Sequence, residues 1–122
     1  GATRPPLFRV DACFDHGSAT AGDTIDLYWS ASSSSTDGTG NSTDVTGVDG
    51  TLTITADLLA QMQYIGSLSL NASDTVSKGH VGFLVPSKRY GSLIVVSGTA
   101  TAAFTTNPPN THIAFSPVSY GT

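Results

Sequence analysis

Short runs of alternating apolar and polar residues, separated by turn-forming residues, constrain the fold of this chain more than any other feature. The first such run is LFRVDACF, in which Phe8, Val10 and Phe14 face one way and the polar side chains face the other. A period of two residues is typical of a β-strand that is buried on one side only. TIDLYWS repeats the pattern and puts Trp29 on the inner face. Because a Trp side chain buries about 150 to 250 Å², we expect Trp29 to be a core anchor.

About eight strands are predicted in this way, at short and fairly regular spacing. In chain order they are LFRVDACF, TIDLYWS, GTLTITA, SLSLNA, HVGFLV, SLIVV, TATAAFT and HIAFSPVSY, the sixth and seventh being either one long strand or two joined by a bulge at Gly98. One further segment, ADLLAQMQYI, has apolar residues at helical spacing. Thr55 or Asp57 is the expected capping residue at the start of this helix. The sequence therefore predicts an all-β fold, an antiparallel β-sandwich or jelly roll of about eight strands with one short helix.

The length of the chain indicates a single domain with a core of its own. A chain of 122 residues can bury about two thirds of its unfolded surface. The expected core residues are Phe8, Val10, Phe14, Leu27, Trp29, Leu52, Ile54, Phe83, Ile94, Val96 and Phe104. The single Cys excludes an internal disulfide. We interpret the Pro-rich segment 1–6 as a hinge from a larger polypeptide, and residues 7–122 as the β-sandwich domain.

The charge pattern argues against several classes of partner. All nine acidic residues are Asp, Lys and Arg together number five, and the formal net charge is -4. Most polar side chains are instead the hydroxyls of 16 Ser and 17 Thr. A weakly acidic domain without a basic stripe is not expected to bind nucleic acid or anionic lipid through charge. No run approaches the roughly 18 apolar residues of a membrane span, so we expect no membrane insertion.

No constellation of catalytic or metal-ligating residues stands out. Ser, His and Asp are all present, but the chain has no G-x-S-x-G elbow, and its Asp residues fall in turns or on polar strand faces. Asp15 beside His16 is better interpreted as a solvated turn than as a metal site, and Cys13 as a passive thiol. The segment 37–41 spaces its oxygens like a calcium loop, but the Gly and the closing Glu of an EF-hand are missing, which favours a plain turn. We therefore expect no enzyme, no metal and no cofactor.

Two polar segments are candidates for contacting a partner. Residues 30–47 form a connection longer than the roughly 12 to 15 residues that a compact domain usually carries without a function or disorder. Its hydroxyls and glycines can hydrogen-bond a glycan or a protein, and a mobile loop without a partner is equally favoured. The second segment is a basic turn that follows Pro86. The candidate contact residues are Ser33, Ser34, Thr36, Asp37, Asn41, Lys88, Arg89 and Tyr90.

The organisation of the whole chain also resembles that of a known family. A Pro-rich spacer leads into LFRVDACFD, and a Ser/Thr-rich β domain of low charge follows, including IDLYWSASSSS. In this the chain resembles the protruding domain at the C-terminus of small RNA-virus capsid proteins, most of all that of the nodaviruses of shrimp and prawns, whose spikes are similar to those of tombusviruses. The resemblance spans most of the chain and rests on organisation, with no single diagnostic motif. It implies a β-sandwich spike on the surface of an icosahedral virion.

The resemblance implies partners as well as a location. Such spikes pair into homodimers and contact host receptors, which are proteins or glycans, and the RNA-binding arm belongs to another part of the capsid protein. The D-x-D calcium motif and the trimer of fish-infecting relatives do not carry over, because this chain has no D-x-D. An alternative of a different class is a carbohydrate-binding β-sandwich module of a secreted or fibre protein. The candidates for its aromatic platform are Tyr28, Tyr64, Tyr90 and Tyr120.

Overall fold

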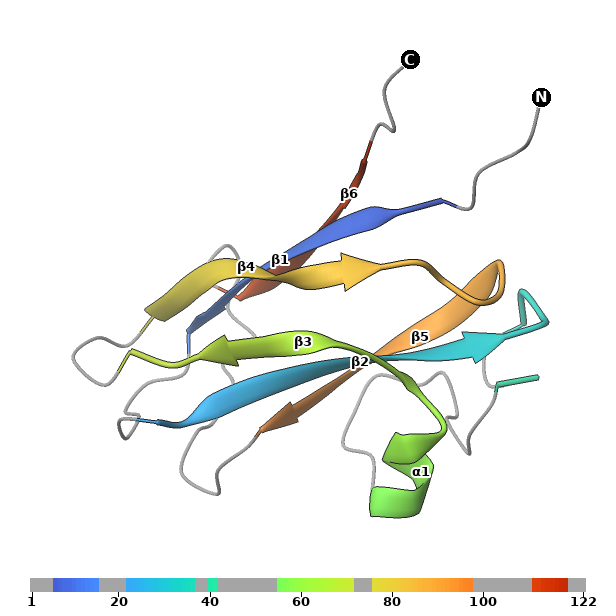
Figure 1. The fold of residues 1–122 in the computed structure, drawn as a ribbon, viewed down its shortest axis with the longest axis horizontal. Helices are drawn as coiled ribbons and strands as arrows, with labels where there is room; N and C mark the ends of the chain where they lie inside the picture. Colours follow the sequence, from blue (N-terminus) through green and yellow to red (C-terminus); the bar gives the residue numbers. More distant parts are fainter. Residues whose placement is uncertain are drawn as a thin grey trace.

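Two antiparallel sheets form this domain in the computed structural model, which describes residues 6–15, 22–36, 40–41, 55–71, 76–97 and 111–118. The strands are β1 (Phe8–Asp15), β2 (Thr24–Ser32), β3 (Gln63–Ser69), β4 (Val76–Leu84), β5 (Tyr90–Ser97) and β6 (His112–Pro117). Sheet A has the order β4-β1-β6, and sheet B has the order β3-β2-β5. Figure 1 shows the two sheets as two layers. The predicted all-β, antiparallel sandwich is confirmed.

The number of strands differs from the prediction, with six among the described residues instead of about eight. The predicted strands at 50–56 and 99–105 fall outside the described residues, except for Thr55 and Ala56, which belong to the start of the helix. Gly98, where a bulge is predicted, and the hinge up to Pro5 also fall outside them. Each of the other six predicted runs contributes one strand.

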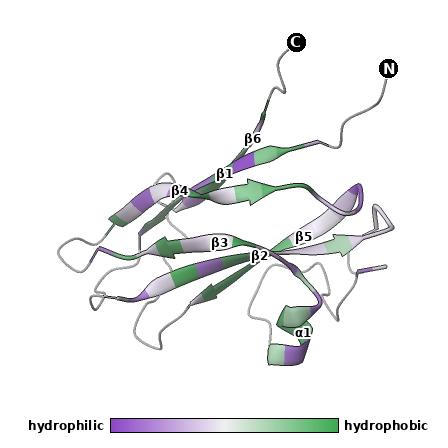
Figure 2. Ribbon diagram, viewed as in Figure 1, coloured by the Kyte–Doolittle hydropathy of each residue, from purple (hydrophilic) through white to green (hydrophobic). Residues whose placement is uncertain are grey.

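The core lies between the two sheets. Its buried cluster consists of Val10, Ala12, Phe14, Ile25, Leu27, Ile65, Leu68, Leu70 and Leu84. Hydrophobic and hydrophilic residues alternate along β1 and β2 in Figure 2, as the predicted period of two requires. Fully burying a side chain of the size of Val, Leu or Phe contributes about 1.5 to 3 kcal/mol. The alternation in the two central strands, β1 and β2, therefore supplies much of the stabilisation of the sandwich.

The predicted inner face of β5 is wrong. Leu93 and Val95 pack against the core, whereas Ile94 pairs with Tyr28 on the outer face of sheet B, and Val96 likewise lies on that face. The reason is visible in the sequence, where SLIVV has four consecutive apolar residues and therefore no alternation that could reveal its inner face. Only the pairing with β2 decides which of these side chains are buried.

Three aromatic residues of the predicted core are less buried than expected. Phe83 is 54% exposed, because it pairs with Arg9 on the outer face of sheet A. Trp29 packs against the core, as expected of an anchor, but it is only half-buried at one end of the sandwich. Phe8 is half-buried as well. The predicted core residues Leu52, Ile54 and Phe104 lie outside the described residues.

The helix is shorter than the prediction of ten residues. Helix α1 (Ala56–Ala60) begins after Thr55, whose Oγ1 accepts a hydrogen bond from the backbone N–H of Leu58 at 3.3 Å. The chain from Gln63 onward is β3 instead, because pairing with β2 buries Ile65 and Leu68 in the core. Tertiary pairing here overrides the helical spacing. Within the described part of the chain, no helix has the length and apolar character needed to cross a membrane.

Two β-bulges join the sheets along one side of the sandwich. In β3, Gly66 pairs with Leu27 and Tyr64 pairs with Tyr28, so that Ile65 is the extra residue. In β4, Val81 is the extra residue in the pairing with β1, and Gly82 follows it. A Cβ atom on Gly66 would overlap the backbone carbonyl of Val81, and one on Gly82 would overlap the carbonyl of Ile65. The backbones of β3 and β4 are therefore in direct contact at the two bulges.

This contact predicts a large difference between two glycines of β4. We expect Gly82→Ala to lower the free energy of unfolding by about 1 to 3 kcal/mol or more, because a backbone carbonyl must move to make room. The matched control is Gly79→Ala, whose Cβ would lie 3.6 Å from Leu68 Cδ1, an ordinary contact, and should change stability by less than about 0.5 kcal/mol. Chemical denaturation of both variants provides the measurement. Equal effects would contradict the close approach of β3 and β4.

Candidate functional site

The first polar segment begins as a return of the chain along the end of β2. Asn41 forms an antiparallel bridge with Ser32, and the backbone N–H of Ser33 donates to the carbonyl of Gly40 at 3.3 Å. The Nδ2 of Asn41 donates to the carbonyl and to the hydroxyl of Ser30, at 3.2 and 3.3 Å. Gly40 has φ of 69°, a conformation that favours glycine. This part of the predicted loop is therefore tied to sheet B.

Serine hydroxyls fix the backbone within this return. The Oγ of Ser32 accepts from the backbone N–H of Ser34 and donates to the Ser34 carbonyl, both at 3.1 Å. The Oγ of Ser34 in turn accepts from the backbone N–H of Thr36 at 3.1 Å. Such local bonds hold Ser-rich segments in turns without a helix or a strand. Several hydroxyls of the run thus have a structural role in addition to their availability for a partner.

The basic turn, which connects β4 to β5, is positioned by a side chain of β3. The Nε2 of Gln63, at the start of β3, donates to the carbonyl of Val85 at 2.8 Å, and its Oε1 accepts from the backbone N–H of Ser87 at 2.9 Å. After the residues that Gln63 binds, the guanidinium of Arg89 lies over the ring of Tyr90, with Cζ 5.5 Å from the ring centroid. Arg89 forms no ion pair with any acidic residue in the described ranges.

The two segments meet around one hollow of about 340 Å³, although they lie roughly fifty residues apart in the sequence. The floor contains Trp29, whose indole ring lies against Gly91; a Cβ atom on Gly91 would overlap this ring. The hollow is lined by Trp29, Ser32, Ser34, Ser35, Thr36, Asn41, Arg89, Tyr90, Gly91 and Ser92. We call it the loop hollow. It offers hydroxyls, an amide, two aromatic rings and one guanidinium, which can hydrogen-bond and pack against a partner.

The predicted contact residues divide into three sets. Those that line the loop hollow are Ser34, Thr36, Asn41, Arg89 and Tyr90. Ser33 and Lys88 are exposed beside it without lining it, and Asp37 lies outside the described residues. Four further lining residues were not predicted and have no special signal in a chain so rich in Ser and Gly: Ser32, Ser35, Gly91 and Ser92. Trp29 also lines the hollow, although the sequence predicts it only as a core residue.

A second site lies on the outer face of sheet B. Tyr28 and Tyr64 are cross-strand partners, with ring centroids 5.3 Å apart and planes at 55°. In the adjacent row Asp26 pairs with Ser67, which donates to the Asp26 carboxylate and hydrogen-bonds the Tyr64 hydroxyl. These four residues, the helix residues Ala56, Leu59 and Ala60, and Met62 just after the helix line a hollow of about 610 Å³, here called the tyrosine hollow. Both tyrosines are platform candidates in the sequence, but no sequence pattern places them side by side.

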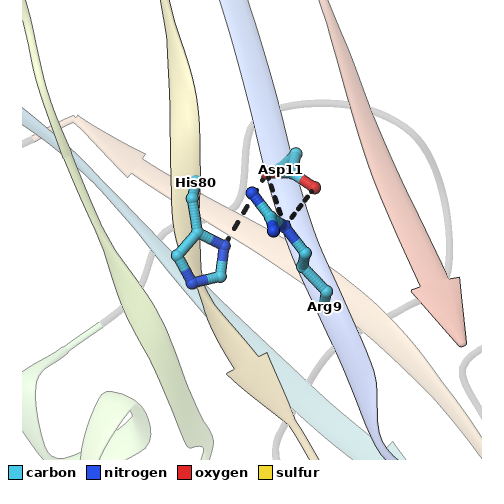
Figure 3. Close-up of polar contacts among 3 residues, drawn as sticks. All are labelled: Arg9, Asp11 and His80. Carbon is cyan, nitrogen blue, oxygen red and sulfur yellow. Dashed lines mark hydrogen bonds and ion pairs between the residues drawn. The ribbon is translucent and has the colours of Figure 1, made fainter. Parts of the chain in front are cut away.

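The outer face of sheet A carries a cluster of titratable groups, shown in part in Figure 3. Asp11 Oδ2 lies 3.1 Å from Arg9 Nε, and Asp11 Oδ1 lies 3.7 Å from His80 Nδ1, an ion pair when the imidazole is protonated. In the next row Cys13 stands between its pairing partners Lys78 and His112, which come from strands β4 and β6. The described residues contain no group of three His, Cys, Asp or Glu side chains able to hold a metal ion.

The Asp–His pair on this face is not the pair singled out in the sequence. Asp15 ends β1, where its backbone N–H donates to Thr111 Oγ1 at 3.1 Å, and His16 lies outside the described residues. The calcium-like segment 37–41 is described only at Gly40 and Asn41, and the Asn41 amide nitrogen is used to tie the chain to Ser30. The geometry therefore gives the two hollows on sheet B, and not an acidic cluster, as the candidate binding sites.

The surroundings of Tyr28 in the tyrosine hollow predict that the stability of the domain falls at alkaline pH. Burial raises the pKa of the Tyr28 phenol above its ordinary value of 10.0, and the negative charge of Asp26 and the neighbouring Tyr64 raise it further. The folded protein thus holds this proton more tightly than the unfolded chain. The stabilisation from Tyr28 is complete below about pH 10 and is lost as the pH rises through the pKa of the folded state.

Absorbance titration of the phenolates measures this shift. The difference between the parent protein and Tyr28→Phe should show a group that ionises above pH 10.0. Asp26→Asn should bring that midpoint down, because it removes the negative charge. A Tyr28 midpoint at or below the ordinary value would contradict the placement of this phenol beside Asp26.

Comparisons of the chain with models of protein families, with curated proteins and with solved structures find no match. No relative therefore supplies a family or an activity for this domain. Its function has to be inferred from its fold, from the two hollows on sheet B, and from the organisation of its sequence.

Proposed function

We propose that this domain is the protruding part of a viral capsid protein and attaches the particle to a host-cell receptor through the loop hollow. The proposal combines the resemblance in sequence organisation with the sandwich fold. A two-sheet sandwich leaves its connecting loops at the ends of the layers, where they are free to contact another molecule. The role is recognition and assembly, with no catalytic step.

The observation that carries the proposal is the convergence of the two polar segments on one hollow. Composition alone selected them as contact candidates, and Gln63 and Asn41 fix them in place through hydrogen bonds to backbone carbonyls. Hydroxyls and an amide that face outward from a fixed backbone can recognise a polar partner at a low entropic cost. Arg89 adds a cation that stacks on Tyr90 and has no acidic partner within the described ranges.

A homodimer is the second part of the proposal. Strands β5 and β6 are at the ends of their sheets, so each has one edge without a neighbouring strand in the described topology. Strand β6 contains no Asp, Lys or Arg, and all of its residues except Ile113 are exposed. An edge strand without Asp, Glu, Lys or Arg has little to prevent pairing with a second copy, and a two-fold contact uses the same patch twice.

The alternative function is a carbohydrate-binding module of a secreted or fibre protein. It is favoured by one observation, the pair formed by the half-buried Tyr28 and the exposed Tyr64 on the outer face of sheet B. Self-association and display on a particle distinguish the two functions. A module of a secreted enzyme has no need of either, whereas a capsid spike requires both.

Sedimentation equilibrium tests the dimer. We expect association that grows between micromolar and millimolar protein, and a two-fold interface that buries about 1,600 Å² or somewhat less. Ala114→Lys on β6 should weaken it, because a lysine on an edge strand opposes pairing. Ser69→Lys on β3 is the control, since it adds the same charge to an exposed position on a different strand. A strictly monomeric protein over the whole range would count heavily against a capsid spike.

Attachment is tested with a pair of charge-matched variants. Arg89→Ala and Lys78→Ala each remove one positive charge from a chain of net charge -4, but only Arg89 lines the loop hollow. Binding of labelled particles to cultured host cells should fall about tenfold with Arg89→Ala, equivalent to about 1.4 kcal/mol, and should remain near the parent level with Lys78→Ala. If both variants bind like the parent, the loop hollow is not the attachment site.

A further inference from the structure

We infer that the tyrosine hollow on the outer face of sheet B is a binding site for a neutral sugar ring. This site is separate from the loop hollow and is formed by different residues. The inference does not depend on whether the domain belongs to a capsid or to a secreted protein, since it rests on the four side chains Asp26, Tyr28, Tyr64 and Ser67 and on the wall formed by α1.

The aromatic part of the site is exposed by the bulge in β3. Because side chains alternate along a strand, Tyr64 would share the inner face of Gly66 and Leu68 if the strand were regular. The extra residue Ile65 takes the inner position, and Tyr64 turns outward beside Tyr28. Tyr64 is 57% exposed. A large aromatic ring held outward at a fixed position on a sheet is a platform on which the apolar C–H face of a pyranose can pack.

The polar part of the site is arranged to accept hydrogen bonds from sugar hydroxyls. Ser67 donates to Asp26 Oδ1 and is bonded to the Tyr64 hydroxyl, so the three polar groups form one chain. In the described part of the molecule, no hydrogen bond is assigned to Asp26 Oδ2, and this oxygen remains an acceptor for a ligand. Hydrogen bonds to a charged acceptor are stronger than those between neutral groups. The phenol of Tyr28 keeps its proton at neutral pH and can donate to a ring or hydroxyl oxygen.

The charge of the site selects against acidic ligands. Among the described residues that line the tyrosine hollow, Asp26 is the only Asp, Glu, Lys, Arg or His. Its carboxylate repels the carboxylate of a uronic or sialic acid, whereas a neutral sugar presents only hydroxyl donors and C–H groups. The opposite wall consists of the apolar residues Ala56, Leu59, Ala60 and Met62. A few oriented polar groups facing an apolar wall are typical of small-ligand sites.

The size and shape of the hollow favour a sugar over a protein partner. Its volume of about 610 Å³ falls within the range of small-molecule sites, about 300 to 1,000 Å³. The two rings are tilted at 55° and form a shallow cleft instead of a flat apolar surface. A docked protein would need a wider apolar patch, and it would desolvate the Asp26 carboxylate, for which the described residues supply only the hydrogen bond from Ser67 to offset the cost.

The binding experiment uses four probes with the unmodified protein. Methyl β-galactoside, methyl β-glucoside and N-acetylglucosamine are neutral, and glucuronic acid is the acidic counterpart. We expect at least one neutral sugar to bind with a Kd of about 1 mM, a typical weak single-ring affinity of about -4.1 kcal/mol, and glucuronic acid to bind at least fivefold more weakly. Two-dimensional NMR should show shifts at Asp26, Tyr28, Tyr64 and Ser67. If none of the neutral sugars binds, or if the shifts map to the loop hollow, the inference is wrong.

Matched variants assign the binding to individual groups. Tyr64→Ala should weaken it at least tenfold, while Tyr64→Phe, which keeps the ring, should retain most of it. Phe83→Ala is the control, because it removes an exposed aromatic ring from the outer face of sheet A, outside both hollows, and should leave the sugar affinity unchanged. Asp26→Asn should reduce the preference for neutral over acidic sugars. A sugar affinity that Tyr64→Ala leaves intact would overturn the assignment, as would one that Phe83→Ala removes.

Discussion

The backbone contact between β3 and β4 is the constraint on which the rest of this structure depends. Each strand has one extra residue followed by a glycine, Ile65 with Gly66 and Val81 with Gly82, and these two pairs lie against each other. Bulges bend a strand and increase its twist, which allows the edges of two sheets to meet. Glycine is needed there for space and not for backbone conformation, since neither residue has positive φ. Each bulge also shifts the alternation of inward and outward side chains by one residue. Tyr64 in β3 and His80 in β4 therefore point outward.

The same edge of the sandwich positions the loop hollow. Gln63 lies at the start of β3, one residue before Tyr64, and its side-chain amide holds the turn at Val85 and Ser87. The turn places Arg89 in the lining of the loop hollow, together with residues of the serine-rich return of the chain. Strand β3 thus positions one wall of the loop hollow through Gln63 and forms part of the tyrosine hollow through Tyr64. A shift in the register of β3 would disturb both sites at once.

Sequence patterns predict this fold where they are regular. They fail where pairing between strands determines which side chains are buried and which residues form a strand. Alternation in β1 and β2 correctly places Val10, Phe14 and Leu27 in the core. It gives no information for the apolar run of β5, and helical spacing extends α1 into residues that pairing converts to β3. Composition identifies Arg89 as a contact candidate of the loop hollow, but the convergence of the two loops depends on hydrogen bonds between distant residues. The tyrosine hollow depends on a bulge, whose only sequence signal is a glycine within an apolar run.

The two hollows on sheet B differ in the physical basis of recognition. Only 11% of the residues are charged, so that hydroxyls, amides and aromatic rings provide most of the surface contacts. The loop hollow holds the cation Arg89, and the attraction of an anionic partner to it would weaken as salt screens the charge. The tyrosine hollow would hold a neutral ring by packing and hydrogen bonds, which salt affects little. Their different responses to ionic strength therefore separate the contributions of the two sites when a glycan or a cell surface engages both, because the salt-sensitive part of the affinity belongs to Arg89.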